Sequence, residues 1–477
     1  MRVAASARSL AHNFFFEATE DAYQIERVEG VIPEWLRGTY YVNGPARFER
    51  AGKKYRHWLD GDGMVCSLRF ERGRVTFRNR FVETPKLRDE GEAGQFLYRG
   101  FGTAFPGDRL RRGLMLEPPA NVSAYAFDGR LLAFGEQSLP FDLDPVTLET
   151  RGEYDFHGKL NEVSPFAAHA KFDEGHLLNF GVQLASEKPV LNVYDFDGGG
   201  ALVHRRRVPL RLPNSIHDFA FTATHYVFLL SPLLMDFGRF VNEGVSVMES
   251  LSWEPERGTE LLLIPRWGKT SETIRVPAAC GYCLHFINAF EDAGNVVIDL
   301  LELDEPVYKD YQPLPDVFAN VKGCRPVRLV VDLKSQEVVG RFPMAYEHTP
   351  DFPSIHPAAA GRPYRDFWML GISAAAEEGP KFFDELAHGI WDTHHIFDVY
   401  RCREGFHLGG EPVLIPDPSG EEDRGVVLVE QFGPETADCE FLLFDARRVS
   451  AGPIAKLPLR HRIHPGFHSS FCPEPSL

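Results

Sequence analysis

The sequence predicts an all-β fold, and in particular a β-propeller, from three observations. Short apolar runs bounded by turn residues recur along nearly the whole chain. Long amphipathic helices are scarce. At 477 residues the chain is too long for one β-sandwich, whereas β-propellers often exceed the usual length of a domain.

The apolar runs have the length of short strands and are rich in Leu, Val and Phe. Clear examples are residues 131–134, 177–180, 226–230, 296–300 and 426–429. Turn residues such as Asp128-Gly129 bound most of them. The 42 Gly and 35 Pro fit a fold with many tight connections. Short helices or loops are expected mainly in residues 232–256 and 375–395.

No shift in composition and no Pro/Ser-rich linker divides the chain, so we expect a single domain over residues 1–477. The sequence shows no crisp repeat, such as a recurring Trp-Asp pair, that would mark individual propeller blades. Two separate all-β domains are therefore the alternative.

Charge and composition exclude some classes of function and indicate a location. The net charge of -17 and the pI near 5.5 argue against nucleic-acid binding, which relies on clustered Lys and Arg. No run approaches the roughly 18 apolar residues of a membrane span, and residues 1–16 lack the apolar core of a signal peptide. Seven thinly spread cysteines suit a reducing compartment. We expect a cytoplasmic protein, with peripheral membrane contact left open.

The 18 histidines include no His-Glu-x-x-His pair, so no helix presents two metal ligands on one face. A metal site in this chain must be assembled from residues far apart in the sequence.

Seven short segments, in order along nearly the whole chain, resemble the carotenoid cleavage oxygenase family. They are residues 41–45 (YVNGP), 57–64 (HWLDGDGM), 97–103 (LYRGFGT), 168–171 (AHAK), 216–219 (IHDF), 284–289 (LHFINA) and 466–468 (GFH). The resemblance implies a seven-bladed β-propeller with a cap of loops and short helices over its axis, where one iron(II) is bound. The third segment, together with residues 144–149 (DPVTLE), is most similar to the bacterial apocarotenoid oxygenases.

The resemblance also implies the metal ligands, one from each of four blades: His169, His217, His285 and His468. Their separations are 48, 68 and 183 residues, so the first two intervals correspond to about one blade each and the last spans several. Imidazole also suits zinc and copper, so the expectation of iron(II) comes from the resemblance.

Carboxylates are expected behind the histidines, because they accept the ring N–H groups and fix the tautomers. Family motifs place Glu136 (in LAFGE), Glu411 (in GEPV) and Asp351 (in DFPS) in these roles. Asp351 stands where relatives have Glu and is one methylene shorter, so either its histidine lies closer or a water intervenes. Glu347 is a weaker candidate.

The resemblance implies oxidative cleavage of a C=C bond by dioxygen, giving two carbonyl products from an elongated apolar apocarotenoid or carotenoid. Candidate substrate-binding residues are Tyr98, Phe101, Gly135, Phe166 and Phe286. Relatives carry Lys or Trp at the position of Gly135. The missing Lys counts against a 4-hydroxystilbene, and the missing Trp implies a roomier pocket.

Three alternatives remain open at this point. The same iron could cleave a stilbene or phenylpropenyl olefin, or it could support a retinoid-isomerase-like activity. The chain could instead be a metal-free propeller that acts as a binding module. The apolar segment 229–241 resembles the loop through which relatives contact a membrane, and packing of this loop over the propeller is the equal alternative.

Overall fold

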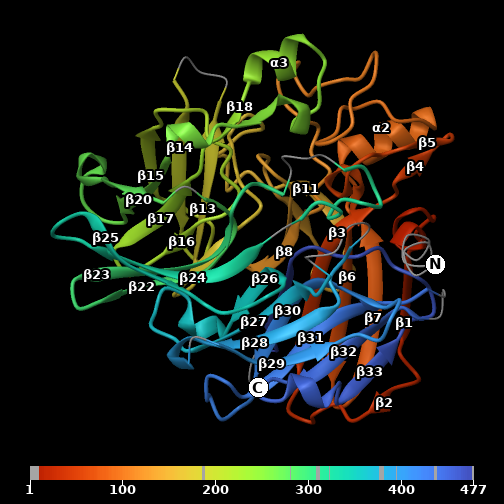
Figure 1. Cartoon of the computed structure of the whole chain (residues 1–477). Helices are drawn as coiled ribbons and strands as arrows, with labels where there is room; N and C mark the ends of the chain where they lie inside the picture. Colours follow the sequence, from red (N-terminus) through yellow and green to blue (C-terminus); the bar gives the residue numbers. More distant parts are fainter. Residues whose placement is uncertain are drawn as a thin grey trace.

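A computed structural model shows seven antiparallel sheets of four or five strands, arranged as the blades of a β-propeller (Figure 1). It describes residues 10–184, 188–279, 281–307, 312–321, 323–374, 381–393, 395–434 and 438–474. The predicted seven-bladed fold is therefore confirmed.

The blades follow one another along the chain, and most inner strands contact the inner strand of the next blade. From the inner to the outer strand, blades 1 to 4 are as follows. Blade 1 contains β34 (Ser469–Pro473), β3 (Gly38–Ala46), β6 (Asp62–Glu71), β7 (Arg74–Phe81) and β1 (Asp21–Gln24). Blade 2 contains β8 (Ser123–Phe127), β9 (Arg130–Phe134), β10 (Phe141–Leu143) and β11 (Thr150–Glu153). Blade 3 contains β12 (Lys171–Asp173), β13 (His176–Gln183), β14 (Val190–Phe196) and β15 (Leu202–Pro209). Blade 4 contains β16 (Ala220–Phe221), β17 (His225–Leu230), β20 (Thr259–Pro265) and β21 (Ile274–Ala278).

Blades 5 to 7 continue the series in the same order. Blade 5 contains β22 (Tyr282–Asp292), β23 (Asn295–Leu303), β24 (Cys324–Asp332) and β25 (Glu337–Pro343). Blade 6 contains β26 (Thr349–Ile355), β27 (Asp366–Ile372), β28 (Glu385–Ile390) and β29 (His395–Arg401). Blade 7 contains β30 (His407–Pro416), β31 (Gly425–Phe432), β32 (Glu440–Asp445), β33 (Ala455–Pro458) and β2 (Glu29–Gly30).

Excursions between the blade strands form the cap that the resemblance implied. Two helices and two small sheets lie on the upper side of the propeller in Figure 1: α2 (Pro85–Ala93), α3 (Phe237–Asn242), β4 (Glu49–Arg50) with β5 (Lys53–Lys54), and β18 (Leu233–Met235) with β19 (Leu251–Trp253). The chain also forms single turns of 3₁₀-helix, including η1 (Trp58–Asp60).

The apolar runs of the sequence correspond to strands that are buried on both faces. Successive side chains of a strand point to opposite faces of its sheet, so each blade packs against both neighbours. Leu131 lies in the seam between blades 1 and 2, whereas Leu132 lies in the seam between blades 2 and 3. Phe367 and Trp368 divide in the same way between the two seams of blade 6.

The circle is closed by strands from opposite ends of the described chain. Strand β34 pairs with β3 in blade 1, and β2 pairs with β33 in blade 7. The red N-terminal strands therefore lie beside the blue C-terminal strands in Figure 1. This closure leaves no blade without a neighbour on either side.

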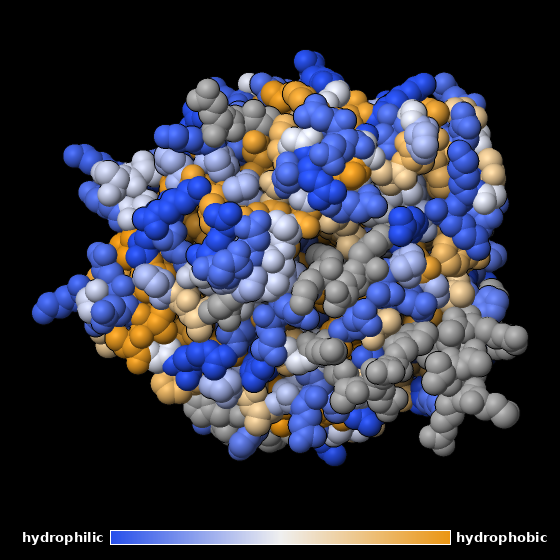
Figure 2. Space-filling view, turned by 45° about the horizontal axis from the view of Figure 1, so that its top comes forward, coloured by the Kyte–Doolittle hydropathy of each residue, from blue (hydrophilic) through white to orange (hydrophobic). Residues whose placement is uncertain are grey.

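The apolar segment 229–241 packs over the propeller through its largest side chains. Leu233, Leu234 and Phe240 are buried, whereas Met235 and Phe237 are partly buried. In Figure 2, hydrophobic residues on the visible face form small patches among hydrophilic ones. Among the described residues, no helix has the length and apolar character needed to cross a membrane.

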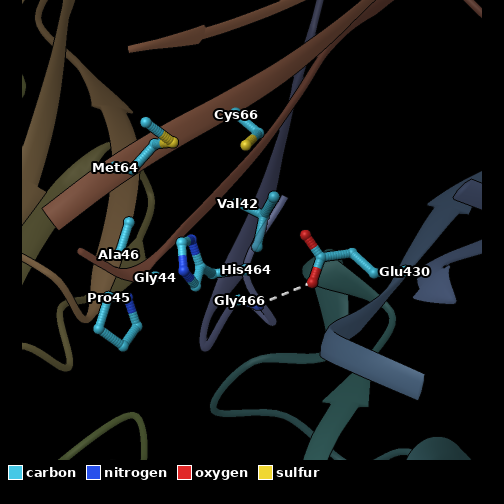
Figure 3. A pocket seen from close by; sticks show the side chains of 9 residues that line it. All are labelled: Val42, Gly44, Pro45, Ala46, Met64, Cys66, Glu430, His464 and Gly466. Atoms are coloured by element: carbon cyan, nitrogen blue, oxygen red, sulfur yellow. Dashed lines mark hydrogen bonds between the residues drawn. The ribbon is translucent and has the colours of Figure 1, made fainter. Parts of the chain in front are cut away.

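A small cavity lies at the seam between blades 7 and 1 and contains a buried acid, Glu430 on β31 (Figure 3). Glu430 Oε2 accepts a hydrogen bond of 2.8 Å from the Gly466 amide. Its other oxygen has no hydrogen-bond partner among the described residues. The cavity is about large enough for one water molecule. Burial raises the pKa of Glu430 to about 8, so this side chain is neutral at pH 7.

Because the pKa of Glu430 is raised, we expect the folded protein to lose stability as pH rises, and we expect Glu430→Gln to remove this loss. Between the ordinary pKa of 4.5 and the folded value near 8, the unfolded chain loses the proton and the folded chain keeps it. The free energy of unfolding of the parent therefore falls as pH rises through this window. The stability of the variant relative to the parent is expected to increase over the same range, by at most a few kcal/mol.

Urea unfolding at about pH 5.5, 7 and 8.5 measures this difference. Glu404→Gln, at an exposed position, is the matched control. A difference between Glu430→Gln and the parent that is the same at all three pH values would contradict the assignment of a neutral Glu430.

Candidate metal centre

Four histidine side chains converge on the propeller axis: His169, His217, His285 and His468. One nitrogen of each ring lies within 4.8 Å of the corresponding nitrogens of the other three. The Nε2 atoms of His169 and His217 are 2.9 Å apart, and those of His217 and His285 are 3.3 Å apart. His169, His285 and His468 are buried, whereas His217 is partly buried. The structure thus brings together all four histidines that the sequence singled out.

Each of these histidines lies at or near the beginning of the inner strand of a different blade. His169 and His217 come just before β12 and β16, His285 lies near the start of β22, and His468 comes directly before β34. The sequence intervals of 48 and 68 residues connect the neighbouring blades 3, 4 and 5. The long last interval crosses blades 6 and 7 and returns to blade 1.

Backbone hydrogen bonds to two other blade-forming segments hold His468 in place. Its carbonyl oxygen accepts from the Asn43 amide at 3.1 Å, and its own amide donates to the Val122 carbonyl at 3.1 Å. The preceding Phe467 amide donates to the Asn43 carbonyl at 2.8 Å. The pairing of β34 with β3 therefore fixes the position of this imidazole.

Three carboxylates lie behind three of the histidines and come from the blades that contribute no histidine. Glu136 follows β9 in blade 2, and its Oε1 lies 2.8 Å from His217 Nδ1. Asp351 on β26 contacts His285 Nδ1 at 2.5 Å, and Glu411 on β30 contacts His468 Nδ1 at 3.1 Å. All seven blades thus contribute a side chain to the histidine–carboxylate assembly.

The contact of Asp351 resolves the question that its shorter side chain raised. The carboxylate meets His285 directly, without a bridging water, because the two atoms are 2.5 Å apart. Glu347, the weaker candidate, is exposed at the surface.

Local irregularities of the backbone aim the carboxylates at the histidines. The strand register shifts between Asp351 and Ser354 and again between Gly409 and Val413, so Asp351 and Glu411 lie at β-bulges. Each carboxylate also has a neighbour with positive φ: Gln137 at 56°, Phe352 at 53° and Gly410 at 67°. Bulges and left-handed residues redirect side chains that regular pairing would place in a seam between blades.

His285 also lies at a bulge. The register of β22 against β23 shifts between Cys283 and Phe286. Regular alternation is interrupted there, so the ring of His285 reaches the axis while Leu284 and Phe286 pack into the two seams of blade 5.

The carboxylate contacts determine which ring nitrogens face the axis as acceptors. His285 and His468 each place Nδ1 in hydrogen-bonding contact with a carboxylate, so the hydrogen is assigned to Nδ1 and Nε2 faces the axis as an acceptor. His217 Nδ1 lies 2.8 Å from Glu136 Oε1, but this oxygen accepts no hydrogen bond among the described residues. With the hydrogen of His217 on Nδ1 as well, its Nε2 lone pair would face that of His285 at 3.3 Å, and the two would repel unless a cation lay between them. If two imidazole nitrogens each bind a metal ion at roughly 2.1 Å and the two bonds are at right angles, the nitrogens lie about 3 Å apart. The four residues therefore fit a metal ion.

The surroundings shift the pKa values of these groups in directions that follow from burial and charge. Burial and the three neighbouring imidazoles hold the pKa of His169 well below its usual value. Burial lowers the pKa of His468 although Glu411 opposes the shift. Burial alone would lower the pKa of His285 and raise that of Asp351, but their mutual attraction reverses both shifts. The Asp351–His285 pair is therefore strongly polarised.

A cavity of about 50 Å³ opens onto the cluster on the side of three of the histidines. Its lining is mostly apolar, as expected of a site for an apolar ligand. The lining consists of His57, Trp58, Leu59, Val122, His217, Leu284, His285, Val307, Val317, Phe318, Asp351, Phe352, Phe467 and His468.

None of the five substrate-binding residues expected from the sequence lines this cavity. Phe166 packs in the seam between blades 2 and 3, and Phe286 packs between blades 4 and 5. Both residues lie near motif residues that face the axis. Because successive side chains of a strand point in opposite directions, Phe166 and Phe286 point into a seam between blades instead.

The other three expected residues lie in the cap or behind the axis. The Tyr98 hydroxyl donates to Asp89. The ring of Phe101 lies 5.0 Å from that of His57, so this residue supports the cavity from behind. A Cβ atom at Gly135 would lie 3.2 Å from the Ala120 amide nitrogen, so a side chain at this position would require the neighbouring backbone to shift.

Sequence reasoning missed most of the cavity lining. His57, Trp58 and Leu59 belong to a matched segment, so attention to that segment would have found them. Val317 and Phe318 come from the connection between β23 and β24, where no motif or periodicity marks them.

A seven-bladed propeller with four histidines on its axis and carboxylates behind them defines a metal-dependent oxygenase of the carotenoid-cleaving type. The chain belongs to the family described as retinal pigment epithelial membrane protein, whose sequence profile matches residues 14–473.

Individual relatives agree with this assignment. The chain is 30% identical to the apocarotenoid-15,15'-oxygenase of Synechocystis sp., over 94% of this chain and 93% of the relative. It is 28% identical to an isoeugenol monooxygenase of Pseudomonas nitroreducens, over 95% of both chains. The crystal structure of cobalt-substituted Synechocystis ACO superposes with a TM-score of 0.89 at 28% identity, covering 98% of this chain and 99% of the other.

Replacement of His285 by alanine is expected to remove most of the bound metal while the chain stays folded, because it deletes one ligand and leaves the seams intact. Metal content by mass spectrometry and secondary structure by circular dichroism measure the two effects. His348→Ala is the matched control, since His348 also contacts a carboxylate, Glu385 at 2.6 Å, but lies outside the cluster. Equal metal content in parent and His285→Ala would contradict the assignment.

Asp351→Glu introduces the residue type that the family motif implies at this position, yet it is expected to weaken metal binding. The 2.5 Å contact with His285 leaves no space for another methylene, so the longer side chain displaces the ring. Changes to such supporting residues typically cost about 10- to 100-fold in metal affinity. Competition with a chelator measures the affinity, and Glu347→Asp is the exposed control. Tighter binding by Asp351→Glu would show that the native contact is suboptimal.

Proposed function

We propose that the chain is a non-haem iron(II) dioxygenase that cleaves a C=C bond of an apocarotenoid or carotenoid into two carbonyl products. The observation that carries this proposal is the convergence of four imidazoles, three of them oriented by carboxylates, at the end of an apolar cavity. His169, His217, His285 and His468 would hold one iron(II) per chain.

The donor set and its surroundings support iron(II). Four neutral imidazoles leave a divalent ion uncompensated, and the nearby carboxylates of Glu136, Asp351 and Glu411 balance its charge. A bound iron(II) would supply the activation of dioxygen against an electron-rich alkene. The cobalt-substituted form of the similar Synechocystis ACO supports a metal centre in this chain.

The protein's own residues would bind and orient the substrate. Trp58, Phe318 and Phe352 line the cavity and would hold one double bond beside the cluster. The carboxylates would keep the imidazoles in one tautomer throughout the reaction. No nucleophilic side chain is needed, because both oxygen atoms of the products come from dioxygen.

The substrate class rests on the relatives. The apocarotenoid-15,15'-oxygenase supports an apocarotenoid, whereas the isoeugenol monooxygenase supports a phenylpropenyl olefin as the second candidate. Peripheral membrane contact through residues 229–241 and a cytoplasmic location remain predictions from the sequence. A single domain over residues 1–477 is part of the same proposal, supported by the continuous series of blades.

The proposal is tested with iron(II)-loaded protein, dioxygen and a panel containing an apocarotenal, isoeugenol and a 4-hydroxystilbene. Oxygen uptake and carbonyl products are measured together, because isomerisation would consume no oxygen. Cleavage of the apocarotenal supports the main proposal, whereas cleavage of isoeugenol alone supports the second candidate. Absence of bound iron after anaerobic loading would refute both and favour a binding module.

Val317→Phe is expected to narrow the cavity without touching the histidines, because Val317 lines its wall on a connection outside the blades. The specificity constant kcat/KM for a long apocarotenal should fall by roughly 10-fold or more, and that for isoeugenol should fall less. Iron content is expected to stay at the parent level. Equal losses for both substrates would show that the cavity does not select by length.

A further inference from the structure

Asp218 is a buried carboxylate that the metal centre described so far does not use. It follows His217 directly in the chain and precedes the inner strand of blade 4. Its side chain contacts residues of the neighbouring blades 3 and 5, so it lies among the three blades that carry His169, His217 and His285.

The two oxygens of Asp218 contact the neighbouring blades on both sides. Oδ1 forms an ion pair of 2.8 Å with Nζ of Lys171, which lies on β12 in blade 3, two residues after His169. Oδ2 accepts a hydrogen bond of 2.9 Å from the amide of Phe286, which follows His285 on β22 in blade 5. One carboxylate therefore connects the segments of three consecutive histidines.

Asp218 also faces the one histidine without a close carboxylate. Its Oδ1 atom lies 3.9 Å from His169 Nδ1, beyond hydrogen-bonding distance. Within the described parts of the chain, no other carboxylate lies within 4.0 Å of His169. Asp218 is thus the counter-charge closest to this imidazole, and Lys171 holds it in position.

We propose that Asp218, held by Lys171, is a positioning residue that fixes the spacing of His169, His217 and His285. The inference rests on the proposed metal centre and adds a fourth carboxylate to the three that contact the rings. An ion pair between a buried carboxylate and a partly exposed lysine contributes little net stability once the cost of desolvating the carboxylate is counted. The position of Asp218 between the three histidine segments is instead explained if Asp218 keeps the three imidazole rings in the correct orientation.

Asp218→Asn and Lys171→Met test this role. The first variant keeps the hydrogen bond from Phe286 but removes the charge, and the second removes the partner on blade 3. The probes are iron(II) and cobalt(II) alone, added anaerobically to the purified full chain. Affinity is measured by chelator competition, and the visible absorption spectrum of the cobalt form reports the arrangement of the ligands.

Asp299→Asn is the matched control. Asp299 is also fully buried and contacts Arg328 at 2.8 and 2.9 Å, but it lies on β23 and takes no part in the histidine cluster. Breaking a buried ion pair is expected to lower the unfolding temperature in every variant. Metal affinity is expected to fall only in the variants that disturb the orientation of the histidine rings.

We expect Asp218→Asn and Lys171→Met to lower metal affinity about 10- to 100-fold and to change the cobalt spectrum. Asp299→Asn is expected to bind metal like the parent in spite of a lower unfolding temperature. Parent affinity and spectrum in both test variants would overturn the inference, as would an equal loss of affinity in Asp299→Asn. If Asp218→Asn does not fold, Lys171→Met decides alone. A parent that binds no metal would instead overturn the proposed function.

Discussion

The closed circle of blades is the constraint on which the rest of the structure depends. Each blade buries both faces against its two neighbours, so the seven seams support one another. Pairing of β34 with β3 completes the last of them. The same closure directs the beginnings of the inner strands to one axis, where four of them supply a histidine.

Because all seven inner strands begin near the axis, each blade can contribute a side chain to the histidine–carboxylate assembly. Blades 1, 3, 4 and 5 supply imidazoles, and blades 2, 6 and 7 supply the carboxylates that orient three of them. A regular strand would turn these side chains into the seams. Bulges and positive-φ residues therefore occur where chemistry requires a side chain at the axis, and regular pairing prevails elsewhere.

The sequence allowed the fold and the centre to be predicted because both leave local signals. Runs such as residues 131–134 are apolar on both faces, and His169 and Glu136 lie in short motifs that resemble a known family. The cavity lining left weaker signals. Phe166 and Phe286 stand beside motif residues, yet alternation along the strand sends them into seams. Val317 and Phe318 reach the cavity from a connection whose path depends on the whole cap.

The position of His468 has a consequence for how the centre is made in the cell. Strand β3 is synthesised long before β34, so blade 1 lacks its inner strand until the other six blades have been synthesised. Three imidazoles and all three carboxylates are translated before the fourth imidazole is available. The fourth imidazole therefore joins the other three only after the rest of the propeller has been synthesised, and it does so as the pairing of β34 with β3 closes the ring.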